Sequence, residues 1–424
     1  MKKQKKKYLS YLTPFKNLKS TTHVNQELFE NLSKNFEKIY IINSENLEFF
    51  NKKKNNGEKK EKINIPNNCI FFNPKNFKEF NEFLIDKDIL VINNFGRTFK
   101  KLKLHLFLKY KNIKMVQVSN IGYPNHQPAI MDFKKNTILS LKYFFDMIIF
   151  RKIVIILGNL GLVAKLEIRF LSNKIIIERI RKNPIKNFLY KRKLFYSKKI
   201  ILVNSRSHDN LYKNKPTLSE EYIVHLDANV NHPDDLLFRE KLDEKTIDNH
   251  YYFLNKSLKK LSEDFKKEVI VCIHPGYDLA KHQSYLSQFK VIQFRTREYI
   301  CKSYLVTVMD SSAVMDAILL KKRVLGLVSE YRCANSRRRG LLNANTYGFM
   351  TTNMKKITSL DKNKILTETE KKIPGYDYFV NNFHTINNPK IIGNDQIVET
   401  IKKNFFNDKN LSLQKYQSSD ALGN

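Results

Sequence analysis

The sequence predicts an α/β protein of two domains, each built on a parallel β-sheet with helices on both faces. Short, almost continuously apolar runs alternate with longer stretches whose apolar residues recur at helical spacing. Such runs are typical of strands buried on both faces, as in a parallel sheet between two helical layers. The alternation stops and restarts near the middle of the 424 residues, a length that suits two or three domains.

The first half of the chain carries one complete set of these elements. Its apolar runs predict strands over residues 38–43, 69–73, 88–93, 113–119 and 199–204. Apolar residues at helical spacing predict helices over 76–87, 99–112 and 183–193. The polar segment 51–62 is expected to be a surface loop. These elements predict a Rossmann-like domain over residues 1–216.

The second half repeats the pattern. Strands are expected over 222–226, 268–273, 290–294, 305–309 and 323–328, with helices over 246–267, 279–289 and 311–322. They predict a second Rossmann-like domain over residues 217–390, its sheet facing the first across a cleft. A C-terminal helix and polar tail occupy 391–424; whether the helix packs back on the first domain stays open.

Composition excludes several classes of protein. With 42% apolar and 12% aromatic residues, the chain is not intrinsically disordered, because it can bury a large core. The four cysteines form no C-x-x-C pair, which excludes a disulfide scaffold and a zinc ribbon and indicates a reducing compartment. The first seven residues, M-K-K-Q-K-K-K, lack the apolar stretch of a signal peptide. A cytoplasmic protein is expected.

The net charge of +35 has two explanations. Lysine, asparagine, isoleucine and phenylalanine all have A/T-rich codons, so base composition accounts for part of it; alternatively the protein contacts polyanions. The longest uncharged run of the most apolar region, Ile153–Ala164, is shorter than the ~20 residues that cross a bilayer. The segment 143–152 interleaves aromatic and basic residues. It is either a buried helix or a surface for an anionic membrane, which would make the protein peripheral on the inner face of the cell membrane.

Two strand ends in the second half carry unusual residues, and ligands of open parallel sheets bind beyond such ends. The first is H-P-G, from His274 to Gly276, after the strand at 268–273. A histidine there can donate to a phosphate or protonate a leaving group. A loop histidine bonded to a backbone carbonyl is the simpler alternative.

The second is D-S-S-A-V-M-D, from Asp310 to Asp316, where a strand turns into a helix. Ser311 or Ser312 suits the N-cap, and the free N–H groups of a helix start can bind phosphate. Ser312 and Asp316 lie four residues apart on one helical face, so a phosphate and a ribose hydroxyl could be held together. Simple helix capping explains the same residues.

Taken together, these motifs resemble a known family. Residues 269–327 are similar to the donor half of bacterial GT-B transferases that build surface polysaccharides. Among these are the CDP-glycerol glycerophosphotransferases, with their D-[YS]-S-S…D-x-x-x-x-x-K-P signature, and the capsule and lipopolysaccharide enzymes that use CMP-sugars. Arg323 stands where those families usually have proline. Upstream, Y-I-V-H-L-D-A-N-V-N-H-P-D (222–234) resembles the opening of the second domain in capsule-synthesis proteins.

The resemblance implies a GT-B-like fold and a role for each motif. His274, with Pro275 and Gly276, would bind the donor phosphate or act as the acid. Ser311 and Ser312 would bind phosphate, and Asp316 would bind ribose or anchor the helix. Asp227 is a candidate catalytic base near the cleft, although an Asx-type loop anchor explains it equally well. No metal and no cofactor are expected beyond the nucleotide-activated donor.

Arginine is scarce in this lysine-rich chain, so base composition does not explain a cluster of arginines, and such a cluster is a candidate binding site. Arg337, Arg338 and Arg339 lie in an expected loop, 329–340, where guanidinium groups suit pyrophosphate or an anionic acceptor. Arg97, in N-N-F-G-R-T, is a candidate on the acceptor side. A solvated charge run is the alternative for the triplet.

The sequence thus predicts a glycosyltransferase, or polyol-phosphate transferase, with a nucleotide-sugar donor, CMP- or CDP-linked, and a surface-polysaccharide or lipid-linked acceptor. The sequence contains no P-loop and no G-x-G-x-x-G, H-E-x-x-H or G-x-S-x-G motif. A nucleic-acid-binding protein is the first alternative, supported by charge alone, and no nucleic acid is expected as a partner. A sugar-nucleotide epimerase of the same fold is the second.

Overall fold

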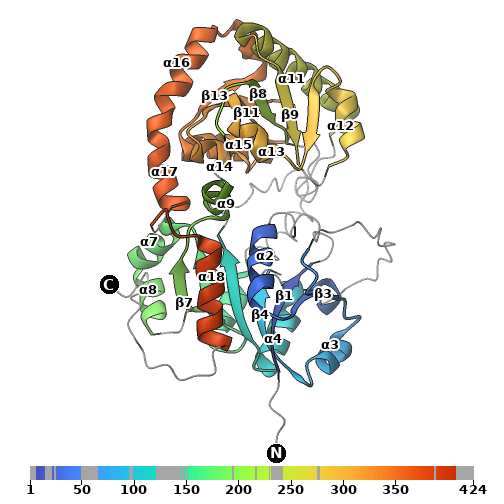
Figure 1. Ribbon diagram of the computed structural model, residues 1–424, viewed down its shortest axis with the longest axis vertical. Coiled ribbons are helices and arrows are strands. Elements are labelled where there is room, and N and C mark those ends of the chain that lie inside the picture. Colours follow the sequence, from blue (N-terminus) through green and yellow to red (C-terminus); the bar gives the residue numbers. More distant parts are fainter. Residues whose placement is uncertain are drawn as a thin grey trace, which may run out of the picture. The chain divides into compact units, whose positions relative to one another are not determined.

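The computed structural model divides into two compact units (Figure 1). The first unit takes the described residues between 1 and 121, between 142 and 209, and from 385 onward; the second takes those between 210 and 384. The structure describes residues 6–14, 22, 25–48, 65–94, 99–120, 145, 149, 151–192, 195–214, 217–228, 230, 242–274, 277–385 and 388–406.

The first unit is built on a seven-stranded sheet in the order β3-β2-β1-β4-β5-β6-β7, with every neighbouring pair parallel. Its strands are β1 (Lys6–Thr13), β2 (Ile39–Asn43), β3 (Cys69–Phe72), β4 (Lys87–Asn93), β5 (Lys114–Ser119), β6 (Leu166–Leu171) and β7 (Ser197–Leu202). Five of them lie where the apolar runs predicted strands. The sequence reading missed β6 and also β1, the strand between β2 and β4 in the middle of the sheet.

Helices cover this sheet and complete its core (Figure 1). They are α2 (Gln26–Asn35), α3 (Phe77–Phe83), α4 (Leu102–Tyr110), α6 (Arg151–Asn159), α7 (Lys174–Lys182), α8 (Pro184–Lys191) and α18 (Gly393–Ile401), while α9 (Arg206–Asn214) spans the division between the units. No helix among the described residues is long and apolar enough to cross a membrane.

The last helix, α18, belongs to the first unit rather than to a separate tail. Its apolar face buries Ile397 and Ile401 in the same core as Leu28 and Leu32 of α2. The buried carboxylate of Asp209 fixes its start by accepting hydrogen bonds from the N–H groups at 393 and 394, each at 2.8 Å. The two units divide at 209/210, and the chain returns to the first unit at 385.

The second unit has a six-stranded parallel sheet in the order β10-β9-β8-β11-β12-β13. Its strands are β8 (Tyr222–Leu226), β9 (Val269–Ile273), β10 (Lys290–Gln293), β11 (Ser303–Val308), β12 (Arg323–Val328) and β13 (Met350–Asn353). Numbered within the unit this is 3-2-1-4-5-6, the Rossmann order, whose switch point lies between the first and fourth strands. Here those strands are β8 and β11.

The helices described in this unit are α11 (Glu244–Phe265), α12 (Leu279–Tyr285), α13 (Thr296–Cys301), α14 (Val314–Leu319), α15 (Ala334–Tyr347), α16 (Lys362–Lys372) and α17 (Tyr376–Phe383). The longest, α11, shows why they form. Asp243 caps its start by accepting from the Thr246 N–H at 2.6 Å. Leu254, Leu258 and Leu261 then recur at helical spacing and are fully buried.

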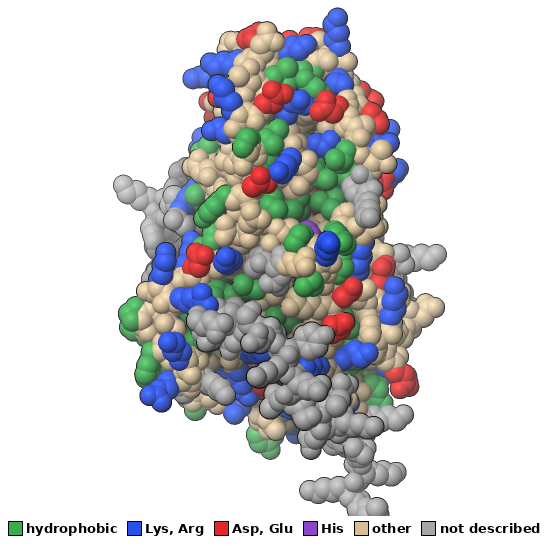
Figure 2. Space-filling model, turned by 60° about the vertical axis from the view of Figure 1, so that its left-hand side comes forward, with side chains coloured by type: hydrophobic (Ala, Val, Ile, Leu, Met, Phe, Trp, Pro, Cys, Tyr) green, Lys and Arg blue, Asp and Glu red, His purple; other side chains and the backbone are tan. Residues whose placement is uncertain are grey.

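Charged side chains are dispersed over the face of the molecule that Figure 2 shows. Figure 2 shows Lys and Arg side chains scattered over one face, with Asp and Glu among them. On this face the positive charge is spread out rather than gathered into one basic patch.

Candidate functional site

The carboxyl edge of the second sheet gathers the motifs that the sequence singled out. Asp227 follows β8, His274 follows β9, and Asp310 to Ser312 follow β11. Because β9, β8 and β11 are adjacent and parallel, these residues lie at the same edge of the sheet, at its switch point. That position is where ligands of doubly wound sheets bind.

His274 is exposed at this edge. Its backbone carbonyl accepts from the Tyr277 N–H at 3.0 Å and from Gln293 Nε2 at 3.1 Å, which fixes the turn after β9. Its ring lies 5.1 Å from the ring of Tyr277. The imidazole is therefore accessible on a defined turn; Pro275 and Gly276 lie outside the described residues.

The two serines after β11 have different environments. Ser311 is half-buried, and its Oγ accepts from the Ala313 N–H at 3.3 Å. Ser312 is exposed, and its hydroxyl has no side-chain partner in the described part of the chain. Ser311 thus stabilises the turn, while Ser312 can bind a ligand.

The helix that follows is shorter than the sequence indicated. α14 begins at Val314, three residues after the expected start, and Ala313 rather than a serine occupies the N-cap position. The N–H groups of residues 314–316 already donate to the carbonyls of residues 311–313, at 3.0–3.3 Å. Few free N–H groups remain there, so a phosphate at this turn would depend on the Ser312 side chain.

Asp316 is held by an ion pair with α13. It is buried, and its Oδ2 accepts from Arg297 Nε of α13 at 3.0 Å. The pair links α13 to α14. Asp316 therefore fits the helix-anchoring role better than the ribose-binding one.

The arginine triplet was expected in a loop, and that prediction was wrong: all three residues lie in α15. Arg337 is exposed, whereas Arg339 Nε donates to Asp310 Oδ2 at 2.8 Å. Gly340 makes this contact possible, because a Cβ there would lie 2.5 Å from the Met309 carbonyl oxygen. The helix packs directly on the end of β11, and Arg339 holds the acidic residue at the start of the serine turn.

Asp227 lies beneath the edge rather than on it. Its side chain is fully buried, so it cannot touch a substrate at this edge. Burial raises the pKa of Asp227, but His225 and His282 beside the carboxylate lower it below its ordinary value. The carboxylate stays ionised inside the protein, among histidines that the sequence reading did not connect with it.

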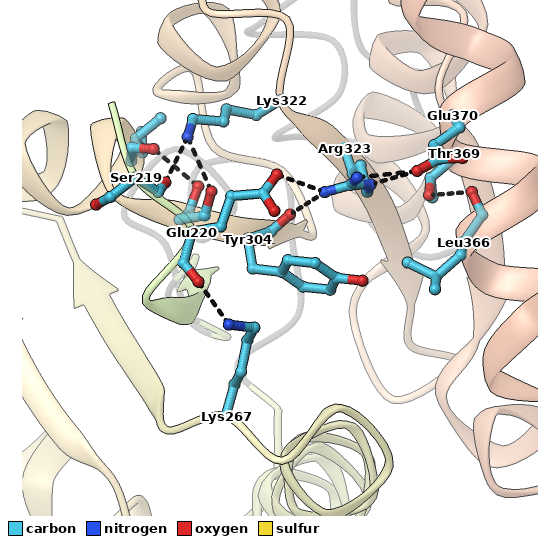
Figure 3. A network of polar contacts seen from close by, with 11 residues as sticks. Ser219, Glu220, Lys267, Tyr304, Lys322, Arg323, Leu366, Thr369 and Glu370 are labelled. Carbon is cyan, nitrogen blue, oxygen red and sulfur yellow. Dashed lines mark hydrogen bonds and ion pairs between the residues drawn. The ribbon is translucent and has the colours of Figure 1, made fainter. Parts of the chain in front are cut away.

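Arg323, which stands where the sequence motif would have proline, is a structural residue. It lies at the amino end of β12 and donates to Glu220 Oε1 at 2.8 Å and to Glu370 Oε1 at 2.9 Å (Figure 3). Beside it, Lys322 donates to the carbonyls of Ser219 and Ser303. This network lies at the edge of the sheet opposite to the candidate site, so the departure from proline leaves that site unaffected.

Two further predictions concern residues that the structure does not describe or describes only in part. Arg97 lies outside the described residues, as do six of the ten residues of the aromatic and basic segment at 143–152. Among the residues that are described, no group of three or more His, Cys, Asp or Glu side chains is arranged to hold a metal ion.

Comparison with known proteins supports the fold and leaves the family open. No protein-family model and no curated protein matches the chain. A putative UDP-N-acetylglucosamine 2-epimerase from Listeria monocytogenes is similar in structure, with 14% identity and a TM-score of 0.50 over 95% of this chain and 97% of that one. The prediction of a GT-B-like fold with two parallel-sheet α/β domains is confirmed.

Two further solved structures show weaker similarity to the chain. The wall teichoic acid polymerase TagF has 13% identity and a TM-score of 0.45, covering 94% of this chain and 89% of that one. The UDP-GlcNAc 2-epimerase from Neisseria meningitidis has 14% identity and a TM-score of 0.46, covering 94% of this chain and the whole of its own.

Proposed function

We propose that the chain is an enzyme that moves a sugar or a polyol phosphate from a cytidine nucleotide onto a surface-polysaccharide or lipid-linked acceptor. The observation that carries the proposal is the pairing of exposed His274 and exposed Ser312 at the switch point of a Rossmann-ordered sheet. In this proposal Ser312 binds the donor phosphate. His274 binds or protonates the phosphate that departs, and exposed Arg337 is available to an anionic ligand.

The proposal includes the location of the enzyme in the cell and the molecules that it binds. The enzyme would work at the inner face of the cell membrane, where a lipid-linked acceptor is found. The dispersed charge seen in Figure 2 gives no support to the nucleic-acid-binding alternative on that face. Tight RNA binding that falls steeply with salt would revive that alternative.

A nucleotide screen tests the donor class. At a ligand concentration of about 100 times the dissociation constant, binding stabilises a protein by about 2.7 kcal/mol, which raises the melting temperature visibly. Among CMP, CDP, UDP and GDP we expect the cytidine nucleotides to give the largest rise. No rise with any of the four would overturn the proposal.

The serines supply a matched pair of variants. Ser312→Ala removes a hydrogen bond to a charged phosphate, worth roughly 1.5–3 kcal/mol, so nucleotide affinity should fall about 10- to 150-fold with little change in stability. Ser311→Ala should instead lower the free energy of unfolding by about 0.5–1 kcal/mol, because its Oγ supports the turn. Unchanged nucleotide affinity in Ser312→Ala would mean that the donor site lies elsewhere.

His274 is tested by kinetics. If its proton stabilises the departing phosphate, His274→Ala lowers kcat more than it raises KM, because the interaction strengthens in the transition state. A rise in KM with unchanged kcat would instead make His274 a binding residue only.

An epimerase acting on a nucleotide-sugar is the second candidate, because the Listeria protein that shares this fold is named as a putative UDP-N-acetylglucosamine 2-epimerase. The two functions separate without an acceptor. An epimerase converts its nucleotide-sugar to the epimer, whereas a transferase shows only slow hydrolysis. Incubation of UDP-N-acetylglucosamine and CMP-sugars with the protein alone, followed by product analysis, decides between them.

A further inference from the structure

Asp227 presents an unbalanced charge inside the second unit. Its backbone N–H donates to the Cys272 carbonyl at 3.0 Å, which sets the residue directly beyond β8. Both carboxylate oxygens are buried and accept no hydrogen bond. Burying an ionised carboxylate without a partner costs several kcal/mol, so a positive charge must lie close by.

Two imidazoles approach the carboxylate from different elements. His225 of β8 places Nε2 3.7 Å from Oδ1, and His282 of α12 places Nε2 3.7 Å from Oδ2. Neither Nε2 has a hydrogen-bond partner, and both are buried. These distances lie within the range of an ion pair and beyond that of a direct hydrogen bond.

The second nitrogen of the His282 ring fixes where its hydrogen lies. His282 Nδ1 is 2.9 Å from the carbonyl oxygen of Asp278, which can only accept, so Nδ1 carries a hydrogen. His225 Nδ1 is 2.9 Å from Thr307 Oγ1, a hydroxyl that can donate to it or accept from it, and the same hydroxyl is 3.4 Å from the Val224 carbonyl oxygen. Nε2 of His282 therefore presents to the carboxylate either a bare lone pair or an additional proton.

Other groups near the carboxylate do not balance it. Burial and the charge of Arg332 lower the pKa of His250 on α11 to about 3, so this histidine is neutral. Burial raises the pKa of Tyr251, which is neutral as well. The guanidinium of Arg332 lies 4.0 Å from Asp310, and no ion pair joins it to Asp227. Among the described residues, the positive charge that balances Asp227 is therefore left to His225 and His282.

We infer that Asp227, His225 and His282 form a buried proton-binding site, in which one protonated imidazole balances the carboxylate. With both rings neutral, the buried carboxylate would have no positive partner and would face the lone pair of His282 Nε2; with one ring protonated, the group has no net charge. Both imidazoles come from elements that meet at the carboxyl edge of the sheet, directly beneath the candidate site.

The site also reaches the turn that carries His274. The ring of His282 lies parallel to that of Tyr277, with centroids 5.2 Å apart, and Tyr277 in turn contacts the ring of His274. An imidazolium on an aromatic face is a favourable contact. Asp227 thus positions His274 through His282 and Tyr277, a step that rests on the proposed donor-binding role of that turn.

Nitrogen NMR of the histidine rings in the full chain tests the proton site. At pH 8 an ordinary histidine, half-protonated near pH 6.5, is neutral. We expect one imidazole to keep both ring nitrogens protonated at pH 8, and Asp227→Asn to abolish that signal. His225→Gln and His282→Gln identify the ring. A wild-type spectrum with every histidine neutral at pH 8, or one metal ion bound per chain, would overturn the inference even if the variants do not fold.

Nucleotide affinity tests the positioning step separately. Asp227→Asn should weaken nucleotide binding by about 3- to 30-fold, the range of couplings carried through packed side chains. Asp264→Asn is the matched control, since Asp264 pairs with Lys260 along α11 and should leave affinity unchanged. If a protonated histidine is found but no nucleotide binds, the donor proposal fails and the proton site stands. If nucleotides bind but no histidine is protonated, only the proton site fails.

Discussion

At the scale of single residues, His250 gives the fold a sensitivity to acid. Its ring is fully buried on α11, and its Nδ1 is 2.8 Å from Ser329 Oγ. Burial and the charge of Arg332 lower its pKa to about 3, whereas in the unfolded chain it titrates near 6.5. Between these values the unfolded state binds one more proton than the folded state. Stability is therefore full above pH 6.5 and falls as the pH is lowered.

The expected slope is up to about 1.4 kcal/mol per pH unit from this one group. Urea unfolding at pH 7, 6 and 5 measures it. His250→Gln should be less stable at pH 7, because the ring packing is lost, but its dependence on pH should be shallower by about one proton. Parallel pH profiles for the two proteins would mean that His250 does not provide the titration.

The sequence located the exposed part of the site better than its buried part. His274, Ser311 and Ser312 could be placed because each directly follows an apolar run, and the end of such a run marks the end of a strand. The partners of Asp227, Asp310 and Asp316 come instead from α12, α15 and α13, far along the chain. No periodicity in one sequence encodes such pairings. His225 lies only two residues before Asp227, yet in the sequence it resembles any other residue of the strand.

At the scale of elements, the predictions failed for a strand that contains polar residues and for a helix that has no apolar stripe. The strand β1 reads K-K-Y-L-S-Y-L-T, and its buried Ser10 donates to the Leu90 carbonyl at 3.2 Å. That polar residue dilutes the apolar signal although the strand lies within the sheet. Conversely, α15 has no apolar stripe, so the segment seemed to be a loop. Its packing on β11 explains why it is a helix.

Gly340 makes the packing of α15 testable. Gly340→Ala would place Cβ 2.5 Å from the Met309 carbonyl oxygen, a backbone atom that cannot move aside alone. We expect the free energy of unfolding to fall by about 1–3 kcal/mol, as for other overpacked sites. Nucleotide affinity should fall too, because Arg339 loses its position beside Asp310. Gly375→Ala is the control, since a Cβ there meets nothing within 4 Å. Equal stability of the two variants would show that the close packing is not needed.

At the scale of the whole molecule, the net charge of +35 and a set of exposed apolar residues favour contact with an anionic membrane. On α8, Ile185 is 70% exposed and Phe188 is 57% exposed. Exposed lysines at 182, 186 and 191 surround them. A helix with apolar side chains among basic ones suits the interface of a bilayer with acidic headgroups.

Sedimentation with vesicles tests this contact. We expect the wild-type protein to sediment with vesicles that contain anionic lipid and to be released by salt, since each lysine near such a surface contributes about 1 kcal/mol. Replacing Ile185 and Phe188 together by serine should reduce vesicle binding at least about tenfold, because partial burial of two large apolar side chains exceeds ~1.4 kcal/mol. Ile85→Ser is the matched control, as Ile85 is 66% exposed beside Asp86. Equal recovery on neutral vesicles would remove the electrostatic part of the argument, and unchanged binding of the double variant would exclude α8 as the contact.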